Sequence, residues 1–181
     1  MMSTTPISRK KLPLFLLGLT FALGVAQAKE LKSIEARAPF SPLALADLAG
    51  KAHSLADYKG KVILVNFWAT WCPPCRAEMP SIQRLKERMA GKPFAILAVD
   101  MAESETDIRA FLKEINPAKI DFTILMDQQG MAIKDWRVSV FPTSFILDTQ
   151  GKLRYSLLGA TAWDADDTVK KIEALLPPAA D

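Results

Sequence analysis

The sequence predicts an α/β fold in which a mixed central sheet is flanked by helices. Three apolar runs, KVILVNFW, FAILAVD and DFTILMD, have strand length and no polar face, as expected for strands buried on both sides of a sheet. Stretches with helical spacing of apolar residues separate these runs, and this alternation is typical of a parallel sheet. A predicted hairpin, TSFILDTQGKLRYSLLG, adds antiparallel strands and makes the sheet mixed.

The first 28 residues are predicted to be a secretory signal peptide. Three basic residues at positions 9–11 precede an apolar run that ends in the small-residue pattern AQA at positions 26–28. The run is shorter than the roughly 20 residues that span a bilayer. We expect cleavage after Ala28 and a periplasmic or other extracytoplasmic location. An uncleaved membrane anchor is the alternative.

The charge of the mature chain argues against nucleic acid as a partner. The whole chain has 23 Lys+Arg and 20 Asp+Glu, and three of the basic residues lie in the predicted signal. The remaining 153 residues are enough for one domain and carry equal numbers of acidic and basic side chains. No basic surplus remains to drive binding to a polyanion. Export also places the chain away from the pools that keep cytosolic thiols reduced.

The mature chain begins with a segment without a clear period. Residues 29–42 contain two prolines and are predicted to be an irregular segment that leads into a single domain at 43–176, with residues 177–181 as a tail. The sequences LALADL and HSLADYKGK flank the short stretch AGK. This arrangement predicts an N-terminal hairpin of two small strands.

Four helices are predicted. After Cys75, apolar residues at 79, 82, 85 and 89 recur at helical spacing, and Gly91 is expected to end this helix. Ser104, with an acid three residues later, predicts the capped start of a second helix. GMAIKDW predicts a short helix, and the last helix is expected to run from near Trp163 to Pro177.

The only two cysteines, Cys72 and Cys75, lie together in the stretch NFWATWCPPCRAEMP. This stretch joins a predicted buried strand to a predicted helix, so that Cys72 falls at a helix N-terminus. Unpaired N–H groups and the helix dipole favour a thiolate there, which makes Cys72 the expected nucleophile. Cys75, one turn further, is placed to resolve a mixed disulfide.

A structural staple, half of a metal site and coincidence are the competing interpretations of this cysteine pair. A disulfide that closes a loop of about four residues restrains the unfolded chain far less than one that closes a 15-residue loop, for which roughly 3 kcal/mol is expected. Zinc takes about four ligands. The chain has no third cysteine and a single histidine, His53. Redox activity without a metal or organic cofactor is therefore the favoured interpretation.

The same stretch resembles the active-site segment of the thioredoxin superfamily, and in particular of the TlpA/ResA-type exported thioredoxin-like proteins. The resemblance continues through LADYKGKVILVNFWATWCPPC, an extra helix and strand between about Glu105 and Leu125, and FPTSFILDTQG. It implies a three-layer thioredoxin-like fold. It also implies a thiol-disulfide oxidoreductase that reduces disulfides in exported proteins, including apocytochrome c, and that is itself reduced by a membrane thiol transporter.

The resemblance assigns a partner groove beside the cysteines. Pro142 occupies the position of the family's cis-proline, which presents backbone to an extended segment of the partner, whereas a plain turn proline is the alternative. Trp71 is expected at the rim where partners dock, and Phe141 borders the same groove. Val140 and Phe141 depart from the family, which usually has a smaller aliphatic residue and a glycine before the proline. These departures alter the expected shape of the groove.

The resemblance also points to a proton acceptor. Glu78 occupies the position where this subfamily carries an acid, and Asn66 stands where cytosolic thioredoxins have a buried aspartate. Because an amide cannot take a proton at ordinary pH, Glu78 is the expected acceptor for Cys75. A carboxylate stabilised only by the helix dipole is the alternative.

Pro73 and Pro74 offer no N–H to a Cys72 thiolate, which favours a reducing couple.

Other functions fit parts of the same pattern. The same chemistry would serve an envelope thiol oxidase or isomerase, and a non-catalytic binding module would keep the fold and use only the groove. A peroxiredoxin-type peroxidase is disfavoured, because its Thr-x-x-Cys pattern needs threonine where Ala69 stands.

Overall fold

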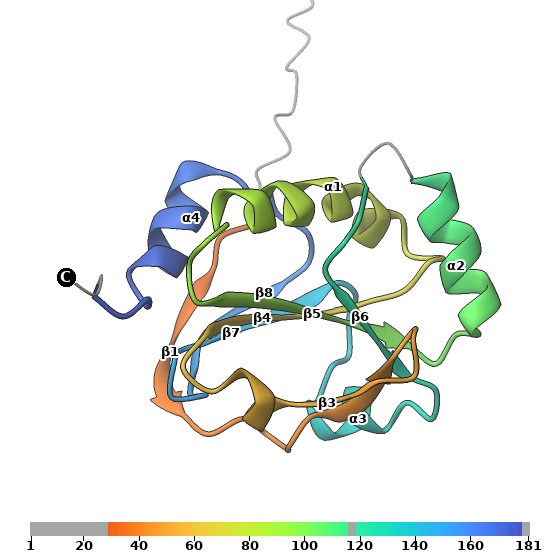
Figure 1. Cartoon of the computed structure of the whole chain (residues 1–181), viewed down its shortest axis with the longest axis horizontal. Helices are drawn as coiled ribbons and strands as arrows, with labels where there is room; N and C mark the ends of the chain where they lie inside the picture. Colours follow the sequence, from red (N-terminus) through yellow and green to blue (C-terminus); the bar gives the residue numbers. More distant parts are fainter. Residues whose placement is uncertain (1–28, 116–118, 179–181) are drawn as a thin grey trace, which may run out of the picture.

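An eight-stranded mixed sheet runs through the middle of the molecule (Figure 1). The structure is a computed structural model that describes residues 29–115 and 119–178. The strand order is β1-β8-β7-β4-β5-β6-β2-β3. The strands are β1 (Lys32–Arg37), β2 (Ala44–Asp47), β3 (Ala52–Ser54), β4 (Val62–Trp68), β5 (Phe94–Met101), β6 (Thr123–Asp127), β7 (Thr143–Leu147) and β8 (Leu153–Leu158).

The centre of the sheet is formed by β4, whose seven residues are all buried. It pairs in parallel with β5, and β5 pairs in parallel with β6. On its other side β4 pairs antiparallel with β7, which continues into the hairpin with β8. An uninterrupted apolar run therefore occupies the one strand that is covered on both faces.

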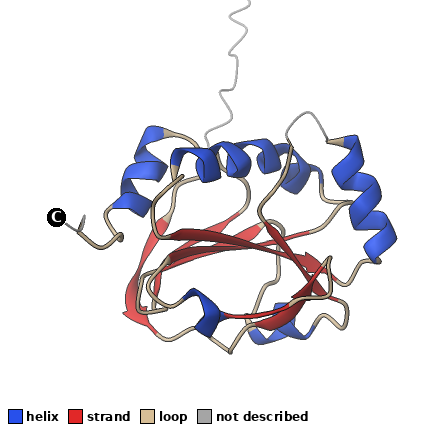
Figure 2. Cartoon of the chain, viewed as in Figure 1, coloured by secondary structure: helices blue, strands red, loops and turns tan. Residues whose placement is uncertain are grey.

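Helices cover the two faces of the sheet unequally (Figure 2). The helices are α1 (Pro73–Arg88), α2 (Glu105–Glu114), α3 (Met131–Asp135) and α4 (Asp166–Glu173), with a 3₁₀ turn, η1, at Leu55–Tyr58. α1, α2 and α4 pack on one face around the larger core cluster, and α3 packs on the other face. This is the predicted three-layer α/β arrangement, and the mixed sheet is confirmed.

The local predictions for most elements are confirmed. β2 and β3 form the antiparallel hairpin, which joins the sheet through β6. The Ser104 hydroxyl accepts from the backbone N–H of Asp107 and so caps α2. The predicted extra helix and strand correspond to α2 and β6.

The prediction that residues 29–42 are irregular is wrong. Residues 32–37 form β1, which pairs antiparallel with β8 at the edge of the sheet. Five of the six β1 residues are exposed, so the strand has no apolar face to identify it in the sequence. Its strand geometry comes from backbone pairing with β8 instead.

Two helix boundaries also differ from the prediction. α1 ends at Arg88, and Gly91 follows in the left-handed region with φ of 77°. α4 begins at Asp166, and the Trp163 backbone N–H, three residues earlier, donates to the Ser81 hydroxyl. The helix ends at Glu173, before the predicted Pro177.

The predicted signal peptide and the last three residues of the predicted tail lie outside the described residues. Within residues 29–115 and 119–178, no helix is both long enough and apolar enough to cross a membrane.

Candidate active site

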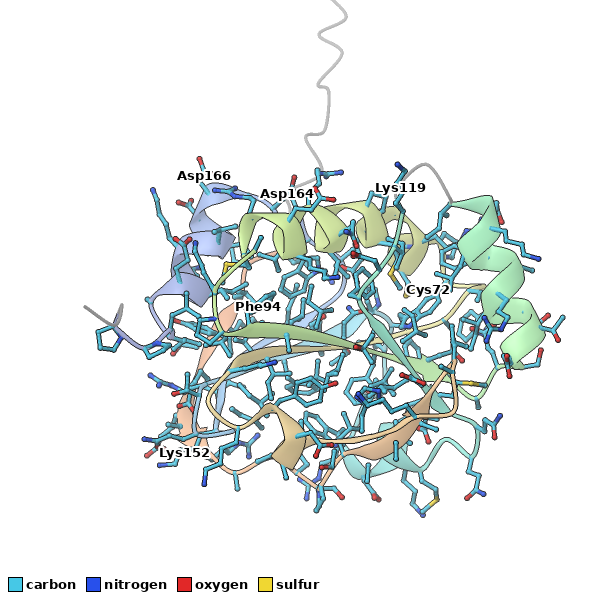
Figure 3. All side chains as sticks on the ribbon, in the orientation of Figure 1. Cys72, Phe94, Lys119, Lys152, Asp164 and Asp166 are labelled. Carbon is cyan, nitrogen blue, oxygen red and sulfur yellow. A yellow bond between two sulfur atoms is a disulfide. The ribbon has the colours of Figure 1, made fainter. Side chains whose placement is uncertain are left out.

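Cys72 and Cys75 form a disulfide at the start of α1, directly after the loop that leaves the central strand. Figure 3 labels Cys72 at the end of α1 that lies nearest α2. Cys72 is the N-cap residue of the helix, with extended backbone, and the two Cα atoms are 5.3 Å apart. The Cys75 backbone N–H donates to the Cys72 sulfur over 3.3 Å. The sulfur thus takes the place that a hydroxyl or carboxylate oxygen occupies in an ordinary helix cap.

The two sulfurs differ in their access to solvent. Cys72 is 4% exposed, whereas Cys75 has no exposed surface. Pro73 and Pro74 occupy the first two helical positions and carry no N–H, so the N–H of Cys75 is the first backbone donor that the helix can offer. The geometry therefore gives Cys72 one backbone hydrogen bond and shields Cys75 completely.

Glu78 lies one turn beyond Cys75 on α1, with only 3% of its surface exposed. Its Oε1 accepts from Asn66 Nδ2 at 2.8 Å, and its Oε2 accepts from Trp163 Nε1 at 3.0 Å. Burial raises the pKa of Glu78 to about 7, although the hydrogen bonds from Asn66, Trp163 and the Thr161 backbone oppose this rise. The carboxyl group is therefore able to hold or release a proton near neutral pH.

Three separate parts of the chain build the pocket around this acid. Asn66 lies on the buried central strand opposite Ser144 of β7, and its amide donates to the Ser144 hydroxyl at 2.9 Å. Trp163 reaches the acid from the loop between β8 and α4. The Ser81 hydroxyl fixes that loop, because it donates to the Glu78 carbonyl and accepts from the Trp163 N–H.

The Phe141–Pro142 peptide bond is cis, as the resemblance implies, and Pro142 is buried. Trp71 is 60% exposed and contacts Phe141 edge to face, with ring centroids 6.0 Å apart. Val140 is 43% exposed. Trp71, Val140, Phe141 and Pro142 therefore form an apolar rim that is joined to the cysteine loop through Trp71.

The structure places the predicted residues in two connected groups. Cys72, Cys75 and Glu78 follow one another along the first turns of α1, and Trp71 meets Phe141 at the rim. Trp68, the last residue of β4, is fully buried.

His53 lies apart from the cysteines, and its two ring nitrogens form hydrogen bonds with Asp47 and Tyr58. Within residues 29–115 and 119–178, no group of three or more His, Cys, Asp or Glu side chains is arranged to hold a metal ion.

Several polar residues around the site are not predicted by the sequence patterns. Trp163 contacts Glu78 from 85 positions away, and Glu103 contacts Thr70 from 33 positions away. Neither contact follows from spacing along a helix or strand. One feature of the sequence could have indicated Glu103. An acid that follows a buried parallel strand lies at the sheet edge where functional groups gather.

Comparison with known families identifies the chain. A family model described as AhpC/TSA matches residues 34–156, which is more than half of the sequence. The chain belongs to the AhpC/TSA family.

Curated relatives are named thiol-disulfide oxidoreductases or thioredoxin-like proteins. The chain is 34% identical over 156 residues to the thiol-disulfide oxidoreductase ResA of Bacillus cereus (strain ATCC 10987 / NRS 248), covering 86% of this chain and 87% of that protein. It is 42% identical over 113 residues to the thioredoxin-like protein YneN of Bacillus subtilis (strain 168), covering 61% of this chain and 64% of that protein.

A solved structure described as thiol:disulfide interchange protein DsbE from Chlorobium tepidum is also similar. It has a TM-score of 0.71 and 28% sequence identity, and the match covers 80% of this chain and 100% of that chain. The protein is therefore a thiol-disulfide oxidoreductase of the ResA type with a thioredoxin-like fold.

We predict that Glu78 makes folding stability depend on pH. Its pKa is about 7 in the folded chain against an ordinary value of 4.5, so the native state keeps a proton that the unfolded chain has lost. The contribution of Glu78 to the free energy of unfolding should therefore be fully present below about pH 4.5. About 3 kcal/mol of it should be lost as the pH rises to about 7. Urea unfolding of oxidised wild type and Glu78→Gln across this range measures the effect.

The Gln variant should lose this pH dependence, because an amide does not titrate. Glu87→Gln is the matched control, since Glu87 is exposed on the same helix. It should keep the wild-type slope. Equal slopes for wild type and Glu78→Gln would contradict the assigned pKa.

Proposed function

We propose that this protein is exported and reduces disulfides in extracytoplasmic proteins through Cys72 and Cys75. The observation that carries the proposal is the asymmetry of the pair, because the N-cap sulfur of Cys72 keeps some exposure and that of Cys75 has none. A partner's sulfur can reach only Cys72. The signal-peptide pattern at residues 1–28 supports export.

The proposed reaction has two exchange steps. In the reduced protein, the Cys72 thiolate attacks one sulfur of the client disulfide, the client S–S bond breaks, and the other client sulfur leaves as a thiolate. Cys75 then loses its proton to Glu78, and its thiolate attacks the Cys72 sulfur. The bond between Cys72 and the client breaks, the second client thiolate leaves, and the Cys72–Cys75 disulfide forms. Two electrons have passed to the client.

Glu78 is proposed as the proton acceptor in the second step. Its pKa of about 7 lies close to that of a thiol, which favours proton transfer at neutral pH. Residues three apart on a helix share a face, so Glu78 lies on the same buried side of α1 as Cys75. Asn66 supports either protonation state, because its amide donates to a carboxylate and, after a flip, its oxygen can accept from a protonated acid.

The apolar rim is proposed to receive an extended client segment. Two carbonyl groups of the rim are already used within the chain, since Pro142 accepts from the Gly159 N–H and Val140 accepts from the Thr143 hydroxyl. Phe141 is left to offer backbone groups to a client, while Trp71 and Phe141 offer apolar surface next to the nucleophile. Clients with an apolar residue beside the reactive cysteine should therefore bind best.

The physiological client and donor extend the same proposal. A disulfide in apocytochrome c is one suitable substrate, because its haem-attachment motif holds two cysteines close in sequence. A membrane thiol transporter would return the oxidised Cys72–Cys75 pair to the dithiol. Because the two prolines reduce the number of donors to Cys72, its thiolate is only moderately stabilised, which favours reduction of clients over oxidation.

The cysteine roles are tested by insulin reduction and by trapping. Wild type should reduce insulin, and Cys72→Ser should have no activity above background. Cys75→Ser, expressed with its signal, should accumulate clients in disulfide linkage to Cys72. Activity in Cys72→Ser equal to that of wild type would instead support a non-catalytic binding module.

The proton-acceptor role is tested by Glu78→Gln. Turnover should fall about 10²-fold or more, the size typical of a lost general base, and the pH at which Cys75 is alkylated should shift. Stopped-flow reduction of a peptide disulfide between pH 5 and 9 measures the rate, and alkylation of the reduced protein over the same range measures the shift. Unchanged rates and an unchanged pH profile would remove Glu78 from the mechanism.

The role of the rim is tested by Phe141→Ala. The rate constant for reduction should fall about fivefold for a peptide disulfide with an adjacent phenylalanine, and less for one with serine. Met131→Ala is the control, because Met131 is an apolar residue with 50% exposure that lies on α3. Equal losses for the two peptides would show that the rim does not select clients.

A further inference from the structure

A second buried acid lies at the end of β5, next to the cysteine loop. Asp100 has no exposed surface and lies opposite Trp68 in the register of β4 and β5. The backbone N–H of Glu103 donates to Asp100 Oδ1 at 3.1 Å. Among the described residues, Asp100 Oδ2 and the Trp68 indole N–H have no hydrogen-bond partner. Asp100 and Glu103 therefore form a pair of neighbouring acids that the proposed disulfide exchange does not use.

The Glu103 carboxylate is bound to the loop that carries Cys72. Its Oε2 accepts from the Thr70 backbone N–H at 2.6 Å, and its Oε1 accepts from the Thr70 hydroxyl at 2.5 Å. Both oxygens are thus engaged by a single residue two positions before the nucleophile. Hydrogen bonds to an ionised acceptor are stronger than those between neutral groups.

The third polar group of Thr70 is also held. Its carbonyl accepts from Arg76 Nη1 at 3.2 Å, and Arg76 forms an ion pair with Glu114 of α2. The Arg76 guanidinium also lies over the Phe111 ring, 4.8 Å from its centroid. Thr70 is therefore fixed to the loop after β5 by its N–H and its hydroxyl, and to Arg76 of α1 by its carbonyl. We call its two donor bonds to Glu103 the Thr70–Glu103 clamp.

The surroundings of Asp100 favour its neutral form. Burial, the contact with Glu103 and the charge of Asp127 on β6 all raise the pKa of Asp100, so that Asp100 is the neutral partner. Arg76 of α1 is the cation on the far side of Thr70. The two Glu103 oxygens accept from Thr70.

We propose that the Thr70–Glu103 clamp positions Cys72. The catalytic meaning of this proposal rests on the proposed function. Only one residue separates Thr70 from Cys72, and the Cys72 N–H donates to Ala69 in the same tight turn. Fixing Thr70 fixes the direction in which the Cys72 sulfur meets the Cys75 N–H. When the clamp is lost, the thiolate loses alignment with the helix N-terminus, and Cys72 becomes a weaker nucleophile.

The test compares Thr70→Val with Thr70→Ser. Valine keeps the shape and the backbone N–H but removes the hydroxyl donor, whereas serine keeps the donor. In Thr70→Val the rate of insulin reduction should fall about tenfold, the size expected for one charge-assisted hydrogen bond, and the pH midpoint of Cys72 alkylation should rise. Thr70→Ser should restore both. Thr106→Val, an exposed threonine on α2, should behave as wild type.

A double-mutant cycle guards against a purely structural effect. Glu103→Gln should reproduce the loss in Thr70→Val, and combining the two should add little, because both act through one contact. Additive losses, or wild-type rate and alkylation midpoint in Thr70→Val, would overturn the proposal. If Thr70→Val does not fold, an unchanged alkylation midpoint in folded Glu103→Gln overturns it equally.

The alkylation measurement also separates the two proposals. It is made on reduced protein without a client, so it reports on the clamp even if wild type fails to reduce insulin. A failure of insulin reduction in wild type would contradict the proposed function alone.

Discussion

The Glu78 carboxyl group is enclosed between α1, the central strand β4 and the loop before α4, where it meets two neutral donors, Asn66 Nδ2 and Trp163 Nε1. Neutral donors stabilise the carboxylate less than a cation would, so burial determines the balance and the proton is held up to about pH 7. The same contacts tie the loop that ends in Trp163 to the helix that carries the cysteines.

We propose that the enclosed acid serves one cysteine of the pair, Cys75. Cys72 is reachable and lies at the helix cap, whereas Cys75 is sealed in the same layer of side chains as Glu78. In the proposed mechanism Cys75 passes its proton to Glu78, because a fully buried thiol has no direct contact with water. The Thr70–Glu103 clamp acts on the other sulfur, by direction rather than by proton transfer. In the two proposals, Glu78 and Glu103 therefore act on different cysteines.

The sequence predicts those features that depend on local pattern. The central strand is clear because all its residues are buried, and Cys72 falls at a helix start because a strand-length run ends just before it. β1 leaves no such signal, since an edge strand with exposed residues is held by pairing and not by an apolar face. The sequence analysis places the start of the last helix near Trp163, whereas α4 begins at Asp166. In the structure the position of Trp163 is set by hydrogen bonds to α1, which no local pattern encodes.

The most direct measurement of the central claim is the titration of the Glu78 carboxyl carbon by NMR in oxidised protein labelled with ¹³C-glutamate, with the signal assigned by its loss in Glu78→Gln. With the disulfide closed, neither cysteine titrates, so the midpoint belongs to the acid in its pocket. The account predicts a midpoint of about 7. A midpoint near the ordinary value of 4.5 would contradict it, because the carboxylate could not then hold a proton taken from Cys75 at neutral pH.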